Sequence, residues 1–148
     1  MAAEEYPKTA CSYRSIMGKL NFLAQSTQPD ITYAVNSCAR FLNNPNFVHY
    51  QAIKCIGCYL YGTHDKGLVL APTNINRLDA YIDSDFAGSW SKSTSHLHHS
   101  ALSRASFVNT YSGCPIHWVS KLESEIALST CKAEYIALSM CTQALLPL

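Results

Sequence analysis

The 148-residue sequence has little charge and almost no excess of either sign. Charged side chains make up 14% of the residues, and the 11 basic and 10 acidic residues give a formal net charge of +1. Proteins that bind nucleic acid through a basic surface usually show a clear excess of lysine and arginine. The composition therefore gives no bulk electrostatic argument for nucleic-acid binding, and any such function must be argued from particular residues.

Long apolar runs are also absent. No run approaches the roughly 18 residues that cross a bilayer, and the acidic stretch Met1–Glu5 lacks the apolar segment of a secretory signal. We therefore expect no membrane partner and an intracellular location, cytoplasmic or nuclear, rather than secretion. Hydrophobic residues still make up 48% of the chain, which is enough for a packed core in one domain or two small units.

The cysteine count is seven, an odd number that argues against a framework of disulfides. Most of these residues fall within apolar helical patterns, so we expect reduced, small, mostly buried side chains in an intracellular protein. Cys55 and Cys58 have the C-x-x-C spacing of redox and zinc sites, but no second such pair follows. We therefore interpret these two cysteines as core residues of a helix.

The first half of the chain has helical patterns. After a loose lead-in over residues 1–12, apolar residues at helical spacing predict a first helix from Tyr13. Thr27 is suited to cap a second helix, because Pro29 and Asp30 then occupy its first turn. This second helix extends to Leu42, and a third helix is predicted from about His49 to Tyr61, where Gly62 suits the C-terminal cap.

A change of pattern follows the third helix. Residues 67–70 predict a short strand, and the segment 72–77 has the proline and asparagine content of a connector. We place the boundary at this connector. It separates a helical segment, residues 13–71, from a second part, residues 78–148.

The second part predicts strands first and a helix last. Strand patterns occur at 78–86, at 106–111 and 116–119 as a hairpin, and at 125–128. The last helix is predicted to begin near Thr130. Residues 89–102 are rich in serine and histidine and have no clean period, so we expect a loop whose histidines form an accidental cluster rather than a metal site.

Two carboxylates have settings typical of a nuclease. Asp83 lies in a strand that ends at Gly88, and Glu134 lies in the first turn of the last helix. Hard cations such as Mg²⁺ prefer carboxylate oxygens, and a pair of cations is a common device for phosphodiester hydrolysis. Blander interpretations stay open: Asp83 as a solvated strand end, Glu134 as a surface residue suited to the helix dipole, or Asp83-Ser84-Asp85 as the metal motif of a sugar-nucleotide transferase.

Four sequence blocks form a larger pattern: residues 13–23, 28–35, 81–88 and 118–139. They include Gln28-Pro29-Asp30-Ile31, Tyr81-Ile82-Asp83-Ser84-Asp85 and Ala133-Glu134-Tyr135. In this order and spacing the blocks resemble the Pol polyprotein of Ty1/copia-type retrotransposons. The resemblance covers almost the whole chain from Tyr13.

The resemblance implies an α/β fold in two parts. Residues 13–71 would be the helical end of a reverse transcriptase, its thumb and connection, and residues 78–148 a truncated ribonuclease H-like mixed sheet with one helix. The first three strands would be antiparallel neighbours. The implied activity is hydrolysis of the RNA strand in an RNA–DNA hybrid, with Asp83 and Glu134 as catalytic ligands of two Mg²⁺ or Mn²⁺ ions.

Departures from the family pattern favour weak or absent activity. Lys132 stands where the family usually has a glutamate, which would complete a capping box with Ser129. Arg104-Ala105-Ser106 lacks the glycine of the family's strand entry, and the further family carboxylates would lie beyond Leu148. The expected partners are the hybrid and the remainder of the Pol polyprotein. The alternative is a non-catalytic remnant that binds nucleic acid or a protein.

Overall fold

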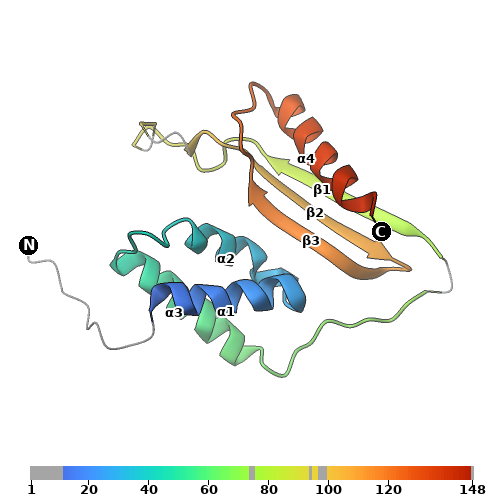
Figure 1. Cartoon of the computed structure of the whole chain (residues 1–148), viewed down its shortest axis with the longest axis horizontal. Coiled ribbons are helices and arrows are strands. Elements are labelled where there is room, and N and C mark those ends of the chain that lie inside the picture. The colour runs from blue at the N-terminus through green and yellow to red at the C-terminus, as the bar shows by residue number, and fades with distance from the viewer. Residues whose placement is uncertain (1–11, 74–75, 94, 97–99, 148) are drawn as a thin grey trace, which may run out of the picture. The chain divides into compact units, whose positions relative to one another are not determined.

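The structure, a computed structural model, describes residues 12–73, 76–93, 95–96 and 100–147. The chain divides into two compact units, and the second begins at Val69, a few residues before the predicted connector. We call residues up to Leu68 the helical unit and residues from Val69 the sheet unit. The fold class is α/β as expected: helices come first, followed by a three-stranded antiparallel sheet and a last helix (Figure 1).

The helical unit contains α1 (Tyr13–Ser26), the 3-10 turn η1 (Pro29–Ile31), α2 (Thr32–Ala39) and α3 (Phe47–Gly62). The predicted role of Thr27 as an N-cap is wrong. Thr27 instead ends α1, where its N–H donates to the Leu23 carbonyl at 3.0 Å. Pro29 has no N–H to donate and begins a 3-10 turn instead of a full α-helix.

Two further helix ends differ from the prediction. α2 stops at Ala39 rather than at Leu42, and the Phe41 N–H donates to the Cys38 carbonyl in a tightened last turn. α3 begins two residues early because Asn46 caps it: the Asn46 side chain accepts from the His49 N–H, and His49 Nδ1 accepts from the Asn46 N–H.

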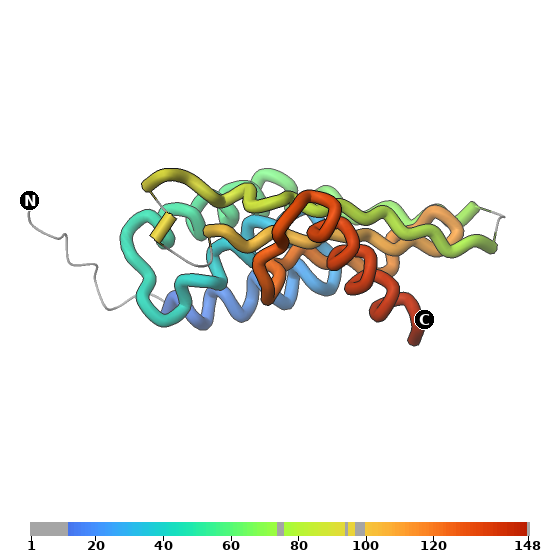
Figure 2. Tube along the Cα trace, turned by 90° about the horizontal axis from the view of Figure 1, so that it is seen from above, coloured from blue at the N-terminus to red at the C-terminus, as the bar shows by residue number. Residues whose placement is uncertain are grey.

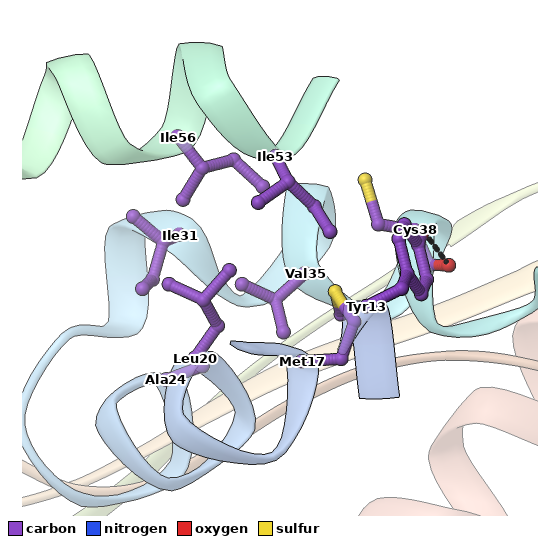
Figure 3. Close-up of a cluster of buried hydrophobic side chains, with 9 residues drawn as sticks. All are labelled: Tyr13, Met17, Leu20, Ala24, Ile31, Val35, Cys38, Ile53 and Ile56. Atoms are coloured by element: carbon purple, nitrogen blue, oxygen red, sulfur yellow. Dashed lines mark hydrogen bonds between the residues drawn. The ribbon is translucent and has the colours of Figure 1, made fainter. Parts of the chain in front are cut away.

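The core of the helical unit is a cluster of nine buried side chains from α1, η1, α2 and α3 (Figure 3). Its members are Tyr13, Met17, Leu20, Ala24, Ile31, Val35, Cys38, Ile53 and Ile56. The spacing of these residues along each helix is the i, i+3, i+4 pattern of a single apolar face. The hydroxyl of Tyr13 donates to the Cys38 carbonyl at 2.8 Å, so the buried polar atom is paired.

The sheet unit contains β1 (Leu78–Asp85), β2 (Arg104–Tyr111), β3 (Cys114–Leu122) and α4 (Thr130–Leu145). The strands lie in the order β1-β2-β3, and both pairs are antiparallel, as predicted. The hairpin turn consists only of Ser112 and Gly113, whose positive φ angles of 51° and 81° are those of a two-residue primed turn. Cys114 and Pro115 therefore belong to β3.

Helix α4 runs alongside the sheet in both views, and it contacts β1 and β2 (Figures 1 and 2). Its buried stripe is Ala133, Ala137 and Cys141. Met140 and Ala144 are only half-buried. The small residues of this stripe let the helix approach the sheet closely.

Several sequence predictions are wrong. Residues 67–70 and 125–128 are not strands, and both segments are largely exposed, with Leu128 exposed over 84% of its surface. A strand needs a neighbour for its backbone groups, and neither segment pairs with β1, β2 or β3. The predicted loop at 89–102 agrees with the described residues there, which contain no strand or α-helix.

The cysteines also differ from expectation. Cys38, Cys114 and Cys141 are buried, whereas Cys55, Cys58 and Cys131 are exposed. Cys11 lies outside the described residues. The apolar stripe of α3 consists of Ile53 and Ile56, which turns both C-x-x-C sulfurs away from the core, so the core interpretation of this pair is wrong.

No helix in the described part of the chain is long and apolar enough to cross a membrane.

Candidate functional site

Asp83 is an exposed residue of β1. It pairs with Ser106 of β2, which pairs with Ser120 of β3, and the two serine hydroxyls lie 3.2 Å apart. Side chains alternate between the faces of a strand, so these three residues share one face of the sheet. Asp85 is two residues along β1 from Asp83 and lies on the same face.

The opposite face of the sheet is the one that α4 covers. Asn109 of β2 accepts a hydrogen bond from the Cys141 thiol of α4 at 3.2 Å, and Asn109 pairs with Ala80 of β1. Ile82, two residues along β1, lines a hollow with side chains of α4. Ala80, Ile82 and Ser84 therefore face α4, whereas Asp83 projects from the other face.

Glu134 is exposed and lies in the second turn of α4, since it is the fifth residue of a helix that starts at Thr130. The predicted position in the first turn is wrong by one residue. The carboxylate borders a hollow of about 380 Å³ whose lining is mainly apolar. These neighbours are Ile82, Cys131, Tyr135 and Leu138.

The structure does not bring the two predicted ligands together, because Asp83 and Glu134 lie on opposite faces of the sheet. Within the described residues no three His, Cys, Asp or Glu side chains are grouped closely enough to hold a metal ion. Paired catalytic cations lie about 3.5–4 Å apart and share ligands between them. The carboxylates as placed here do not fit that arrangement.

A third carboxylate, missed by the sequence analysis, lies on the α4 face. Glu123 follows β3 directly and is 3% exposed. Its N–H donates to the Ser103 carbonyl at 2.9 Å, and Ser84 donates to its Oε1 at 3.3 Å. Its Oε2 is buried with no hydrogen-bond partner. No sequence signal pointed to it, because the predicted strand ended at residue 119, whereas β3 extends to Leu122.

The environment of Glu123 favours the protonated acid. Burial raises the pKa of this carboxyl, the hydrogen bond from Ser84 opposes the rise, and the negative charge of Glu134 adds to it. The negative charge of Glu134 therefore acts on Glu123, although the two residues come from different elements. The α4 face of the sheet carries an acidic pair that sequence patterns did not reveal.

In the turn after β1, Gly88 lies close to the Asp85 carboxylate. Ala87 has a positive φ of 49°, and a Cβ at Gly88 would overlap the Asp85 carboxylate. A residue with a Cβ at this position would require the Asp85 carboxylate to move. β1 itself ends at Asp85, before Gly88.

The N-terminus of α4 has half of a capping box. Ser129 accepts from the Lys132 N–H at 3.2 Å, as predicted. Lys132 has no carboxylate to accept a hydrogen bond from the Ser129 N–H, and its charge lies at the positive end of the helix dipole.

Of the loop histidines, only His96 lies within the described residues, so their grouping is not described.

Comparison with known proteins shows similarity to retrotransposon Pol polyproteins. The "Retrovirus-related Pol polyprotein from transposon TNT 1-94" of Nicotiana tabacum is 38% identical over 125 residues, 84% of this chain and 9% of that protein. The corresponding protein from transposon RE1 of Arabidopsis thaliana is 37% identical over 83% of this chain and 8% of its own length. The chain is a distant homologue of Ty1/copia-type Pol polyproteins. It spans less than a tenth of these Pol relatives.

A relative of similar length also exists. "Secreted RxLR effector protein 161" of Plasmopara viticola is 32% identical over 131 residues, 88% of this chain and 87% of the effector. The two chains belong to one family, homologous to part of Pol. That relative is named as secreted, so our expectation of an intracellular location stays a prediction. No family model matches the chain, and no solved structure matches it.

Proposed function

We propose that this chain corresponds to the junction of reverse transcriptase and ribonuclease H in a Ty1/copia-type Pol polyprotein, and that it does not cleave RNA–DNA hybrids by itself. Homology to Pol polyproteins over 83–84% of the chain supports the first part. The placement of Asp83 and Glu134 on opposite faces of the sheet supports the second part and carries the proposal.

In this proposal the helical unit is the end of the reverse transcriptase and the sheet unit is the beginning of ribonuclease H. The helical unit contains α1, η1, α2 and α3, and the sheet unit has three antiparallel strands followed by α4. The RNA–DNA hybrid, the remainder of Pol and two Mg²⁺ or Mn²⁺ ions would belong to the longer protein.

The chemistry explains why the geometry matters. Two-metal hydrolysis needs carboxylates that hold both ions beside the same phosphate, so that one activates water and the other stabilises the leaving oxygen. Carboxylates on opposite faces of a sheet cannot bind the same two metal ions. Buried Glu123 and exposed Glu134 do not replace them, since no third ligand lies close enough within the described residues.

The test is a cleavage assay with a labelled RNA–DNA hybrid and either Mg²⁺ or Mn²⁺. The proteins are the wild type, Asp83→Asn, Glu134→Gln and Glu125→Gln, a matched control at an exposed position outside the helices and strands. Circular dichroism first establishes that each protein is folded. We expect no cleavage above background by any of the four.

Metal-dependent cleavage by the wild type that both Asp83→Asn and Glu134→Gln abolish, but Glu125→Gln retains, would overturn the proposal. Fluorescence anisotropy with the same hybrid tests the alternative of a binding remnant. Binding without cleavage, equal in all four proteins and independent of divalent ions, would identify the chain as such a remnant.

A further inference from the structure

The exposed side of α3 carries two thiols that the proposed function does not use. Cys55 and Cys58 lie three residues apart in the middle of this 16-residue helix, and both are exposed and free. Residues at this spacing are neighbours on a helix surface. The buried residues Ile53 and Ile56 hold the opposite side of α3 in the core, which fixes the outward direction of the two sulfurs.

The helix geometry is too wide for a disulfide. Cβ atoms three residues apart on a helix are separated by about 5–6 Å, whereas a disulfide requires about 3.5–4.5 Å. A metal ion held between two sulfurs spans a wider gap, because each metal–sulfur bond is about 2.3 Å long. An intact α3 thus favours a bridging ion over a direct sulfur–sulfur bond.

The number of available ligands selects the kind of ion. Zinc sites take four ligands, and iron–sulfur clusters are held by four ligands, usually cysteines. The described residues contain no group of three His, Cys, Asp or Glu side chains that could provide such a set. Asp30 lines a hollow of about 260 Å³ together with Cys55, but its Oδ2 accepts a 2.6 Å hydrogen bond from Tyr59.

We propose that Cys55 and Cys58 form a two-thiolate site on α3 that binds one soft, monovalent metal ion of the Cu(I) class. Soft thiolates favour Cu(I) over hard cations, and the pair offers two sulfurs on one face with solvent access. This inference is independent of the nuclease proposal, since it rests on the helical unit alone.

The other described cysteines are weaker competitors for such an ion. Burial raises the pKa of the Cys38 and Cys141 thiols, which reduces the thiolate that a metal ion needs. Cys114 is buried in the sheet unit. Cys131 is exposed, but it lies on α4 without a second cysteine one turn away, which makes it a matched single-thiol control.

The experiment titrates the full reduced chain with Cu(I), supplied without oxygen as its acetonitrile complex, against a Cu(I)-selective chelator. Wild type is compared with Cys55→Ser, Cys58→Ser and Cys131→Ser, and circular dichroism establishes the fold of each. We expect one tightly bound ion per wild-type chain, and a loss of affinity of about 100-fold in either α3 variant because chelation is lost. Cys131→Ser should bind as the wild type does.

X-ray absorption of the copper-loaded chain provides a second readout and should show two sulfur ligands. Wild-type affinity in both Cys55→Ser and Cys58→Ser would overturn the proposal. It would also be overturned by a stoichiometry of one ion per two chains, since the four α3 thiols of two copies would then form the site.

Discussion

The two units of the chain differ most in what they bury. The helical unit has a core of nine side chains in which every residue is hydrophobic. The sheet unit buries smaller residues, such as Ala105, Ala133 and Ala137, together with many polar ones. Its buried polar and charged residues are Ser100, Ser103, Arg104, Asn109, Thr110, Ser112, Ser120 and Glu123.

This difference has an energetic consequence. Four buried side-chain atoms within the described residues have no hydrogen-bond partner, and all four lie in the sheet unit. They are Ser103 Oγ, Asn109 Nδ2, Thr110 Oγ1 and Glu123 Oε2. Each such atom costs about 1–3 kcal/mol relative to a paired one. Apolar burial therefore stabilises the helical unit, while unpaired polar atoms weaken the sheet unit.

The largest expected effect tests the apolar core. Met17→Ala removes a fully buried side chain, so we expect the helical unit to lose about 2–5 kcal/mol of unfolding free energy. Far-ultraviolet circular dichroism during urea unfolding measures this loss. Both tryptophans, Trp90 and Trp118, lie in the sheet unit, so their fluorescence reports the other unit and should change little.

Phe22→Ala on the same helix is the control, because Phe22 is 71% exposed. We expect a change within about 0.5 kcal/mol. Equal losses in the two variants would contradict the assignment of the core. A matching shift of the tryptophan transition in Met17→Ala would show that the units unfold together, which would break the comparison.

The next effect concerns an unpaired hydroxyl. Thr110→Val keeps the side-chain shape and removes the buried Oγ1, so we expect the sheet unit to gain about 1 kcal/mol. Tryptophan fluorescence during urea unfolding provides the measurement. Thr142→Val on the exposed side of α4 is the control and should give no gain, since its hydroxyl donates to the Leu138 carbonyl. Lower stability in Thr110→Val would mean that the hydroxyl has a partner.

A smaller effect depends on pH. The folded pKa of Glu123 is raised above its ordinary value of 4.5. At a pH between 4.5 and the folded pKa, Glu123 is therefore mostly protonated in the folded state and mostly ionised in the unfolded state. The carboxylate thus costs stability at neutral pH, and the cost disappears as pH falls through the folded pKa toward 4.5. Glu123→Gln should be more stable than the wild type at pH 7 and equal to it in acid.

Urea unfolding of the two proteins at a series of pH values measures this difference, with Glu125→Gln as an exposed control. The expected gain is smaller than for Thr110→Val, because glutamine still leaves one buried polar atom unpaired. A gap between Glu123→Gln and wild type that stays constant with pH would rule out titration of Glu123 as its cause.

The smallest effect compares the helix caps of the two units. α3 has a complete capping box formed by Asn46 and His49, whereas α4 has only Ser129. Lys132→Glu should complete the box and suit the helix dipole, adding about 0.5–1 kcal/mol to the sheet unit. Lys132→Met removes the charge alone and should add less. Equal stability gains in Lys132→Glu and Lys132→Met would mean that removal of the positive charge accounts for the whole effect.

Local patterns predicted the elements well where local physics decides them. Helical spacing identified α1 and α3, Pro29 identified a helix start, and alternation with turn residues identified the β2–β3 hairpin. The misses have tertiary causes. Residues 67–70 have strand-forming side chains but no neighbouring strand, and the exposed C-x-x-C pair follows from which face of α3 enters the core.

The candidate site shows the same division. The sequence placed Asp83 on a strand and Glu134 near the start of a helix, since each position depends on residues within one element. It could not place them relative to each other, because a face of a sheet is defined only by what packs on it. Glu123 was missed for the same reason: its hydrogen-bond partners, Ser84 and Ser103, are distant in sequence.

By itself, then, the sequence determined the order and type of the helices and of the three paired strands, the two-part division and the resemblance to Pol, because these depend on local spacing and on residue identity. Only the tertiary structure decided which face of the sheet α4 covers, which carboxylates share that face, and which thiols point to solvent. Packing makes those choices, since long-range contacts bury one side of each element and leave the other exposed.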